Sequence, residues 1–140
     1  MKSGKGFTLI EILVAATIIA LLSSVAAVTF SQFSQQSRDA KRKADLEQIR
    51  AAVEMYRSNN DVYPATIGTS LCDPGGCASG TYMQKVPSDP KGTTYAYYYA
   101  GSDTDYTVGA YLEATSTSCS VAISCTGANC NYCLGPYGAK

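Results

Sequence analysis

The side chains best suited to chemistry in this sequence are six cysteines and one isolated glutamate. The cysteines are Cys72, Cys77, Cys119, Cys125, Cys130 and Cys133. The glutamate, Glu11, is the only ionisable side chain between Lys5 and Arg38. The 140 residues include 11 basic and 11 acidic side chains but no histidine. Histidine is the commonest general base and metal ligand, so the composition argues against an enzyme and against His-based metal sites.

Residues 7–30, which contain Glu11, form an apolar segment long enough to cross a membrane. As a helix the segment would span about 36 Å, and the hydrocarbon core of a bilayer is about 30 Å thick. Lys2 and Lys5 precede it, and the positive-inside tendency then predicts a cytoplasmic N-terminus with the remainder of the chain across the membrane. A lone carboxylate inside a span costs on the order of 3 kcal/mol, so Glu11 is expected to have a partner. No lysine or arginine lies within the span, and the partner must come from another chain or from a newly made amino terminus.

The string KGFTLIE at residues 5–11 resembles the processing motif of type IV prepilins and type II secretion pseudopilins. The resemblance implies that residues 1–6 are a leader, which a prepilin peptidase removes between Gly6 and Phe7, and that Phe7 is then N-methylated. It also implies that Glu11 pairs with the free N-terminal amine of a neighbouring subunit in a homopolymeric filament. The implied partners are the peptidase, an assembly ATPase, an inner-membrane platform protein and minor pilins or pseudopilins.

A secretory signal peptide is the alternative interpretation of the N-terminal segment. The sequence Ser24-Val25-Ala26 offers a small-residue cleavage site. Against it, the apolar segment is longer than the usual ~7–15 residues of a signal peptide, and Glu11 lies within it. Cleavage there would release an exported, disulfide-rich binding domain.

Helical periodicity continues past the membrane segment and predicts one helix from about residue 7 to about residue 58. Its apolar stripe would contain Phe30, Phe33, Ser37, Ala40, Ala44, Leu46, Ile49, Val53 and Tyr56. Residues 31–58 are then amphipathic. The opposite face holds Arg38, Lys41, Arg42, Asp45, Glu47, Arg50, Glu54 and Arg57. We expect this charged face to be solvated rather than to bind anionic lipid or DNA, and no specific nucleic-acid partner is expected.

Residues 59–140 predict a small antiparallel sheet. Residues 94–99 and 105–112 are rich in strand-forming side chains, and residues 101–104 between them have turn chemistry, so the three segments predict a hairpin. A stretch of this size has a marginal core of its own. Packing on the second half of the long helix completes that core, which gives the α+β, type IV pilin-like fold that the resemblance implies.

Two further segments resemble the major pseudopilin of type II secretion. Tyr63-Pro64 follows the long helix, and residues 86–95 read VPSDPKGTTY, with two prolines and a glycine before the sheet. The resemblance implies a structural subunit of a secretion pseudopilus, first in the cytoplasmic (inner) membrane and then in a periplasmic or extracellular filament. A type IV pilus subunit for adhesion, twitching motility or DNA uptake is the alternative. The cysteine-rich tail, residues 114–140, favours that alternative because the pseudopilin pattern does not extend through it.

The same resemblance implies a calcium site near the C-terminal strands. Ser102, Asp103 and Asp105 supply oxygen ligands of the right kind in that region. The pattern also fits an Asx-type turn, which we favour. Apart from calcium, no cofactor is expected.

The cysteines all follow the membrane segment, on the side expected to be oxidising, and predict disulfides. Cys72 and Cys77 flank a four-residue turn and are expected to pair locally. The other four predict two more bridges in an order that the spacing leaves open. Cys130 and Cys133 also have the spacing of a zinc or redox motif, but no second such pair accompanies them and no strand–helix context surrounds them.

Overall fold

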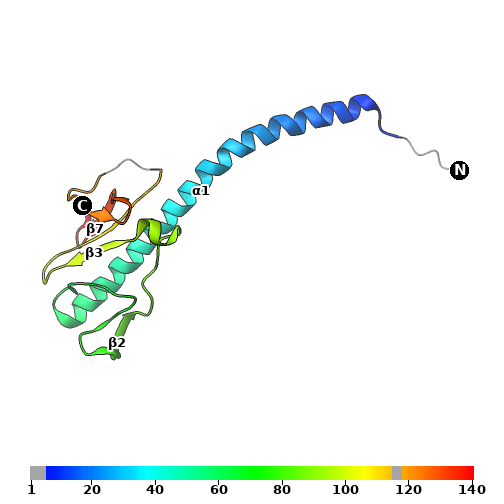
Figure 1. The fold of residues 1–140 in the computed structure, drawn as a ribbon. Helices are drawn as coiled ribbons and strands as arrows, with labels where there is room; N and C mark the ends of the chain where they lie inside the picture. Colours follow the sequence, from blue (N-terminus) through cyan, green and yellow to red (C-terminus); the bar gives the residue numbers. More distant parts are fainter. Residues whose placement is uncertain (1–5, 115–117) are drawn as a thin grey trace. The chain divides into compact units, whose positions relative to one another are not determined.

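The computed structural model describes residues 6–114 and 118–140 and divides into two compact units, one up to Gln35 and one from Gln36 to Lys140. A single α-helix, α1 (Leu9–Asn60), supplies residues to both units (Figure 1). It begins and ends slightly later than the expected 7–58. Asp61 has φ 61° and its N–H donates to the Arg57 carbonyl at 2.8 Å, which ends the helix with a left-handed residue. The first five residues of the expected leader, with Lys2 and Lys5, lie outside the described residues.

The second unit carries eight short strands in three antiparallel sheets. They are β1 (Leu71–Asp73), β2 (Gly76–Met83), β3 (Tyr98–Gly101), β4 (Tyr106–Ala110), β5 (Ser124–Cys125), β6 (Ala128–Asn129), β7 (Tyr132–Gly135) and β8 (Gly138–Ala139) among the described residues. The sheet orders are β1-β2, β3-β4-β7-β8 and β5-β6. The predicted hairpin is present as β3 and β4, with Tyr99 opposite Val108.

One strand expectation is wrong. Residues 94–97 do not extend the hairpin, because Gly92–Tyr95 form a 3-10 helix, η1, and β3 begins only at Tyr98. The Gly92 N–H donates to the Asp89 carbonyl at 2.9 Å, and Gly92 has φ 69°. This turn bends the chain just before β3. Tertiary context therefore overrides the β propensity of residues 94–97, while Tyr98 and Tyr99 remain in the strand.

The core of the second unit lies between α1 and the four-stranded sheet. Its buried side chains are Leu46, Ile49, Ala52, Val53, Tyr56, Tyr63, Leu71, Tyr106, Val108, Ala110 and Leu134. Tyr63 and Tyr106 pack edge to face, with ring centroids 4.7 Å apart. The small sheet thus buries the apolar face of the helix, which confirms the predicted α+β, pilin-like fold.

The buried face of α1 also differs from the predicted stripe. Ala40, Ala44 and Phe33 are exposed, whereas Asp39, Arg42 and Asp45 are buried. The expectation of a fully solvated charged face is therefore wrong for Arg42 and Asp45. Residues 39, 42, 46, 49, 53 and 56 are spaced three or four apart, so the face that meets the sheet continues through the charged residues.

Candidate functional site

The first candidate site is the start of α1, where Thr8 and Glu11 form a capping box. Glu11 Oε2 accepts hydrogen bonds from Thr8 N and from Thr8 Oγ1, each at 2.7 Å. In return, Glu11 N donates to Thr8 Oγ1 at 3.4 Å. The reciprocal pattern satisfies donors that a helix N-terminus leaves unpaired. The carboxylate predicted to act between chains is thus held within its own chain at the first turn of the helix.

Gly6 and Phe7 precede the capping box in exposed, non-helical backbone. Phe7 is 84% exposed. A Cβ added to Gly6 would meet no atom within 4 Å, and Gly6 has no positive φ. Nothing in the described fold therefore requires glycine at residue 6.

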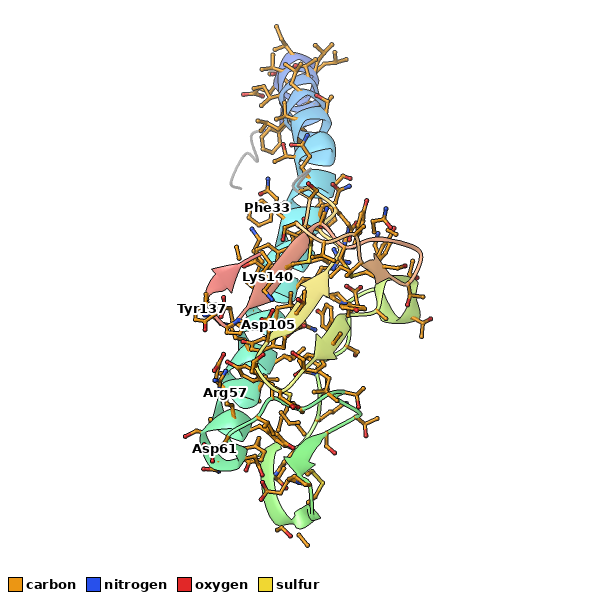
Figure 2. The ribbon with its side chains drawn as sticks, turned by 90° about the vertical axis from the view of Figure 1, so that its left-hand side faces the viewer. Phe33, Arg57, Asp61, Asp105, Tyr137 and Lys140 are labelled. Atoms are coloured by element: carbon orange, nitrogen blue, oxygen red, sulfur yellow. A yellow bond between two sulfur atoms is a disulfide. The ribbon has the colours of Figure 1, made fainter. Side chains whose placement is uncertain are left out.

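The helix surface that follows is apolar on all sides. Leu9 is 84% exposed, and the large exposed side chains continue through Leu22 and Val25 to Phe33. Figure 2 shows these side chains projecting all around the first turns of the helix. By length and composition, α1 can cross a membrane; no other helix among the described residues passes that test. Exposed apolar area of this extent needs lipid or neighbouring chains to cover it.

Arg42, a fully buried arginine, is the centre of an ion network in the second unit. Its Nε and Nη2 donate to the two carboxylate oxygens of Asp89 at 2.6 and 3.1 Å. Its Nη1 donates to Asp39 Oδ1 and to Glu113 Oε1, both at 2.8 Å. One guanidinium therefore joins α1 to the turn before β3 and to the segment that follows β4.

The carboxylates around Arg42 have further partners. Glu113 accepts from Arg38 Nε and Nη2 at 2.8 and 2.7 Å and from Lys91 Nζ at 2.7 Å. Asp39 accepts from the backbone N–H of Glu113 at 2.9 Å. Burial is the largest effect on the pKa of Arg42 and lowers it, but the hydrogen bonds to the three carboxylates outweigh burial and raise it.

The network gives residues 86–95 a physical role. Asp89 Oδ1 accepts from Lys91 N at 2.7 Å while the same carboxylate holds Arg42. The aspartate between the two prolines therefore fixes the turn into η1 and attaches it to the helix.

Glu113 predicts a specific acid dependence of stability. The Arg38 hydrogen bond is the main cause that holds the pKa of Glu113 well below its usual 4.5, with Lys91 and Arg42 contributing. A lowered folded-state pKa stabilises the fold above the unfolded value and loses that stabilisation as pH falls through the folded value. We expect the free energy of unfolding to fall below about pH 4.5, and Glu113→Gln to flatten that fall.

Chemical denaturation at a series of pH values measures this effect. Glu47→Gln is the control, because Glu47 is exposed and pairs with Arg50 at 3.4 Å. An acid dependence that is the same in Glu113→Gln and in the unmodified chain would contradict the assignment.

The six cysteines are joined as Cys72–Cys77, Cys119–Cys133 and Cys125–Cys130 within residues 6–114 and 118–140. The local pairing expected at residues 72 and 77 is present. Cys130 and Cys133 belong to different bridges, so this structure has neither a zinc cluster nor a redox pair at that motif.

The two tail disulfides pack directly on the sheet. Cys125, Cys130 and Cys133 are buried with Ile123 in a second small cluster. A Cβ at Gly109 in β4 would lie 3.2 Å from the sulfur atoms of both Cys130 and Cys133. Absence of a side chain at residue 109 thus lets the bridged tail lie against β4.

Removing the Cys119–Cys133 bridge should destabilise the second unit. The cysteines are 14 residues apart, and closing a loop of that length stabilises a fold by about 3 kcal/mol in the chain-entropy estimate. We expect Cys119→Ala/Cys133→Ala to lose about that amount in chemical denaturation. Cys72→Ala/Cys77→Ala, with a separation of 5, should lose about 1 kcal/mol less. A larger loss of unfolding free energy in Cys72→Ala/Cys77→Ala than in Cys119→Ala/Cys133→Ala would contradict this loop-length argument.

The predicted calcium residues lie in the turn between β3 and β4. Ser102 Oγ donates to the Asp105 carbonyl at 3.0 Å and accepts from Asp105 N at 3.2 Å, which closes the turn. The Asp105 carboxylate is bound instead by Lys140 Nζ. Sequence reasoning did not select Lys140 or the buried Arg42 pairs.

Comparisons with known proteins cover the chain up to residue 116. Residues 30–116 match the family described as "Type II secretion system (T2SS), protein G", and residues 1–27 match the prokaryotic N-terminal methylation motif. The type II secretion system core protein G of Pseudomonas aeruginosa is 31% identical, over 72% of this chain and 78% of its own length. The chain belongs to the type II secretion protein G family. The core protein G of Vibrio cholerae is 28% identical, over 72% of this chain and 75% of its own length.

The similarity to type IV pilins is weaker, and the protein G match does not include the C-terminal tail. The type IV major pilin PilE1 of Neisseria gonorrhoeae is 27% identical but over only 59% of this chain and 38% of its own length. No solved structure matches. The protein G match ends at residue 116, so four of the six cysteines lie beyond it. Membership of the protein G family supports a structural pseudopilin role over a pilus role, and the bridged tail is a departure from the matched region.

Proposed function

We propose that this protein is a pseudopilin that polymerises into the filament of a type II secretion system. The observation that carries the proposal is the succession of two matches along one chain. A methylation motif covers the start of an exposed apolar helix, and the protein G match covers the domain that follows. An enzyme role finds no support, because the family is a structural one and the sequence has no histidine.

The proposed precursor crosses the cytoplasmic membrane once, with its N-terminus in the cytoplasm. A prepilin peptidase cleaves between Gly6 and Phe7, and Phe7 is N-methylated. The exposed position of both residues supports access by the peptidase. The assembly ATPase, the inner-membrane platform protein and the minor pseudopilins are the proposed partners in polymerisation.

Glu11 has the proposed role of pairing with the new amine of Phe7 in an adjacent subunit. The amine and the carboxylate would meet among apolar helices, where their attraction is strong and an unpaired charge is costly. The capping box supports the role, because Thr8 holds the carboxylate at the end of the helix where the new amine forms.

Deleting the gene tests the proposal. Secreted enzymes should accumulate in the periplasm, and the unmodified chain supplied in trans should restore their export. A chain with Gly6→Val should fail to restore export and should remain at precursor mass, while Ser24→Ala, a change on the apolar helix, serves as the control. Normal secretion with loss of surface filaments would instead support the type IV pilus alternative, which the bridged tail favours.

A further inference from the structure

The side chain of Lys140 lies in a ring of oxygen atoms. Its Nζ donates to Asp105 Oδ1 and Oδ2 at 2.7 and 2.6 Å and to the Tyr106 carbonyl at 2.9 Å. The Thr107 hydroxyl is a fourth oxygen at 3.4 Å. An ammonium has three donors, and the three short contacts use all of them. The Lys140 hydrogen bond lowers the pKa of Asp105, so the carboxylate is ionised over a wide pH range.

Strand β7 must be crossed for this contact to form. Lys140 follows β8 at the edge of the sheet, and Asp105 precedes β4, with β7 between the two strands. The Lys140 N–H donates to the Cys133 carbonyl at 3.0 Å, which fixes the backbone from which the side chain extends. Figure 2 shows Lys140 and Asp105 close together on this face of the sheet.

Gly135 in β7 provides the path. A Cβ at residue 135 would overlap Cε of Lys140 and lie 3.1 Å from its Nζ. The lysine side chain therefore runs over the one place in β7 where no side chain stands in its way. The ion pair between Lys140 and Asp105 therefore depends both on the lysine after β8 and on the glycine at residue 135 in β7.

The oxygen set around Lys140 is one that suits a hard cation. Carboxylate, carbonyl and hydroxyl oxygens are the ligands that calcium uses, although calcium takes six to eight of them at about 2.3–2.6 Å. The Lys140 contacts have instead the length of charge-assisted N–H···O bonds, about 2.7–2.9 Å. Ser102 does not join the set, because its hydroxyl is used inside the turn. The residues therefore fit a held ammonium and not a resident calcium ion.

We propose that the Lys140 ammonium occupies the cation position of the β3–β4 turn, as a tethered substitute for a bound divalent ion. The turn before β4 is thereby joined to the end of β8, on the far side of β7. The stability of this domain is then independent of calcium. Removing the lysine side chain should open the oxygen set to calcium.

Thermal unfolding of the full chain in detergent, with calcium chloride or with a calcium chelator, tests the proposal. The melting temperature of the unmodified chain should be the same in both. Lys140→Ala should melt lower in chelator, by about 4–8 °C at most, because the Asp105 side chain is 55% exposed and an exposed ion pair stabilises a domain of this size only modestly. Millimolar calcium should restore part of that loss, and magnesium should restore less.

Three variants complete the experiment. Asp105→Asn should melt as low as Lys140→Ala but should not respond to calcium. Gly135→Ala should also melt lower, because it displaces the lysine while leaving both charges. Asp103→Asn, in the same turn, should leave the melting temperature unchanged.

Each opposite result overturns the proposal. A fall in the melting temperature of the unmodified chain on chelation would show that a divalent ion belongs to the native fold. No loss in Lys140→Ala would show that the ammonium does not lock the turn. A lower melting temperature of Lys140→Ala that calcium does not raise would show that Lys140 and Asp105 form an ordinary ion pair and not a substitute for a divalent ion.

Discussion

Replacing Arg42 with methionine is expected to lower the free energy of unfolding by about 3–5 kcal/mol, the range for breaking a buried ion pair from one side. Methionine fills similar volume but donates nothing, so Asp39 and Asp89 would be left buried without their main cationic partner. Both carboxylates are almost wholly buried, at 5% and 4% exposed, and water cannot replace the guanidinium there. Chemical denaturation of the full chain in detergent measures the loss.

Two variants distinguish the contribution of the Arg42 hydrogen bonds from that of its positive charge. Lys41→Met removes a neighbouring but exposed cation and should change the free energy by less than about 0.5 kcal/mol. Arg42→Lys keeps the charge but cannot bind Asp89 with two nitrogens, and should lie between the other two variants. A loss below about 1 kcal/mol in Arg42→Met would mean that the carboxylates find other partners.

The same network shows where sequence reasoning stops. A charged residue on an amphipathic helix is normally solvated, and that prior fails for Arg42 because its partners Asp89 and Glu113 lie 47 and 71 residues away in the chain. By contrast, the long helix and the β3–β4 hairpin depend on local periodicity and turn residues, and both were predicted correctly apart from η1. Local signals identify elements, but a buried charge is explained only by groups that the fold brings to it.

The disulfides also divide into one that local sequence predicts and two that depend on the fold. Cys72 and Cys77 were predicted to pair because a short turn separates them. The order in the tail could not be derived from spacing, since Cys130 and Cys133 are nearest in sequence and yet do not pair. The hairpin of β5 and β6, with Gly127 at φ 88°, places Cys125 beside Cys130 and leaves Cys133 to Cys119. Knowledge of the hairpin is therefore needed before the bridges can be assigned.

The second large effect is expected at Glu11. We expect Glu11→Gln to be inserted and cleaved normally but to reduce filament yield more than about a hundredfold. The proposed pair would lose its anion, and an unpaired amine among apolar helices costs about 3–5 kcal/mol, which corresponds to two orders of magnitude or more in the binding constant. Filament yield is measured by shearing and quantifying assembled subunits, and cleavage by the intact mass of the membrane-bound chain.

Loss of the capping box has to be distinguished from loss of the pair. Glu11→Gln also weakens the hydrogen bonds to Thr8, and a helix cap contributes about 1 kcal/mol. Thr8→Ala removes the two hydrogen bonds of the Thr8 hydroxyl but keeps the backbone N–H of residue 8 and the Glu11 carboxylate. It should therefore reduce filament yield about tenfold at most. If Thr8→Ala and Glu11→Gln were equally defective, with both chains cleaved, the role of Glu11 would be confined to its own helix. If Thr8→Ala assembles and Glu11→Gln does not, the carboxylate acts on a neighbouring subunit.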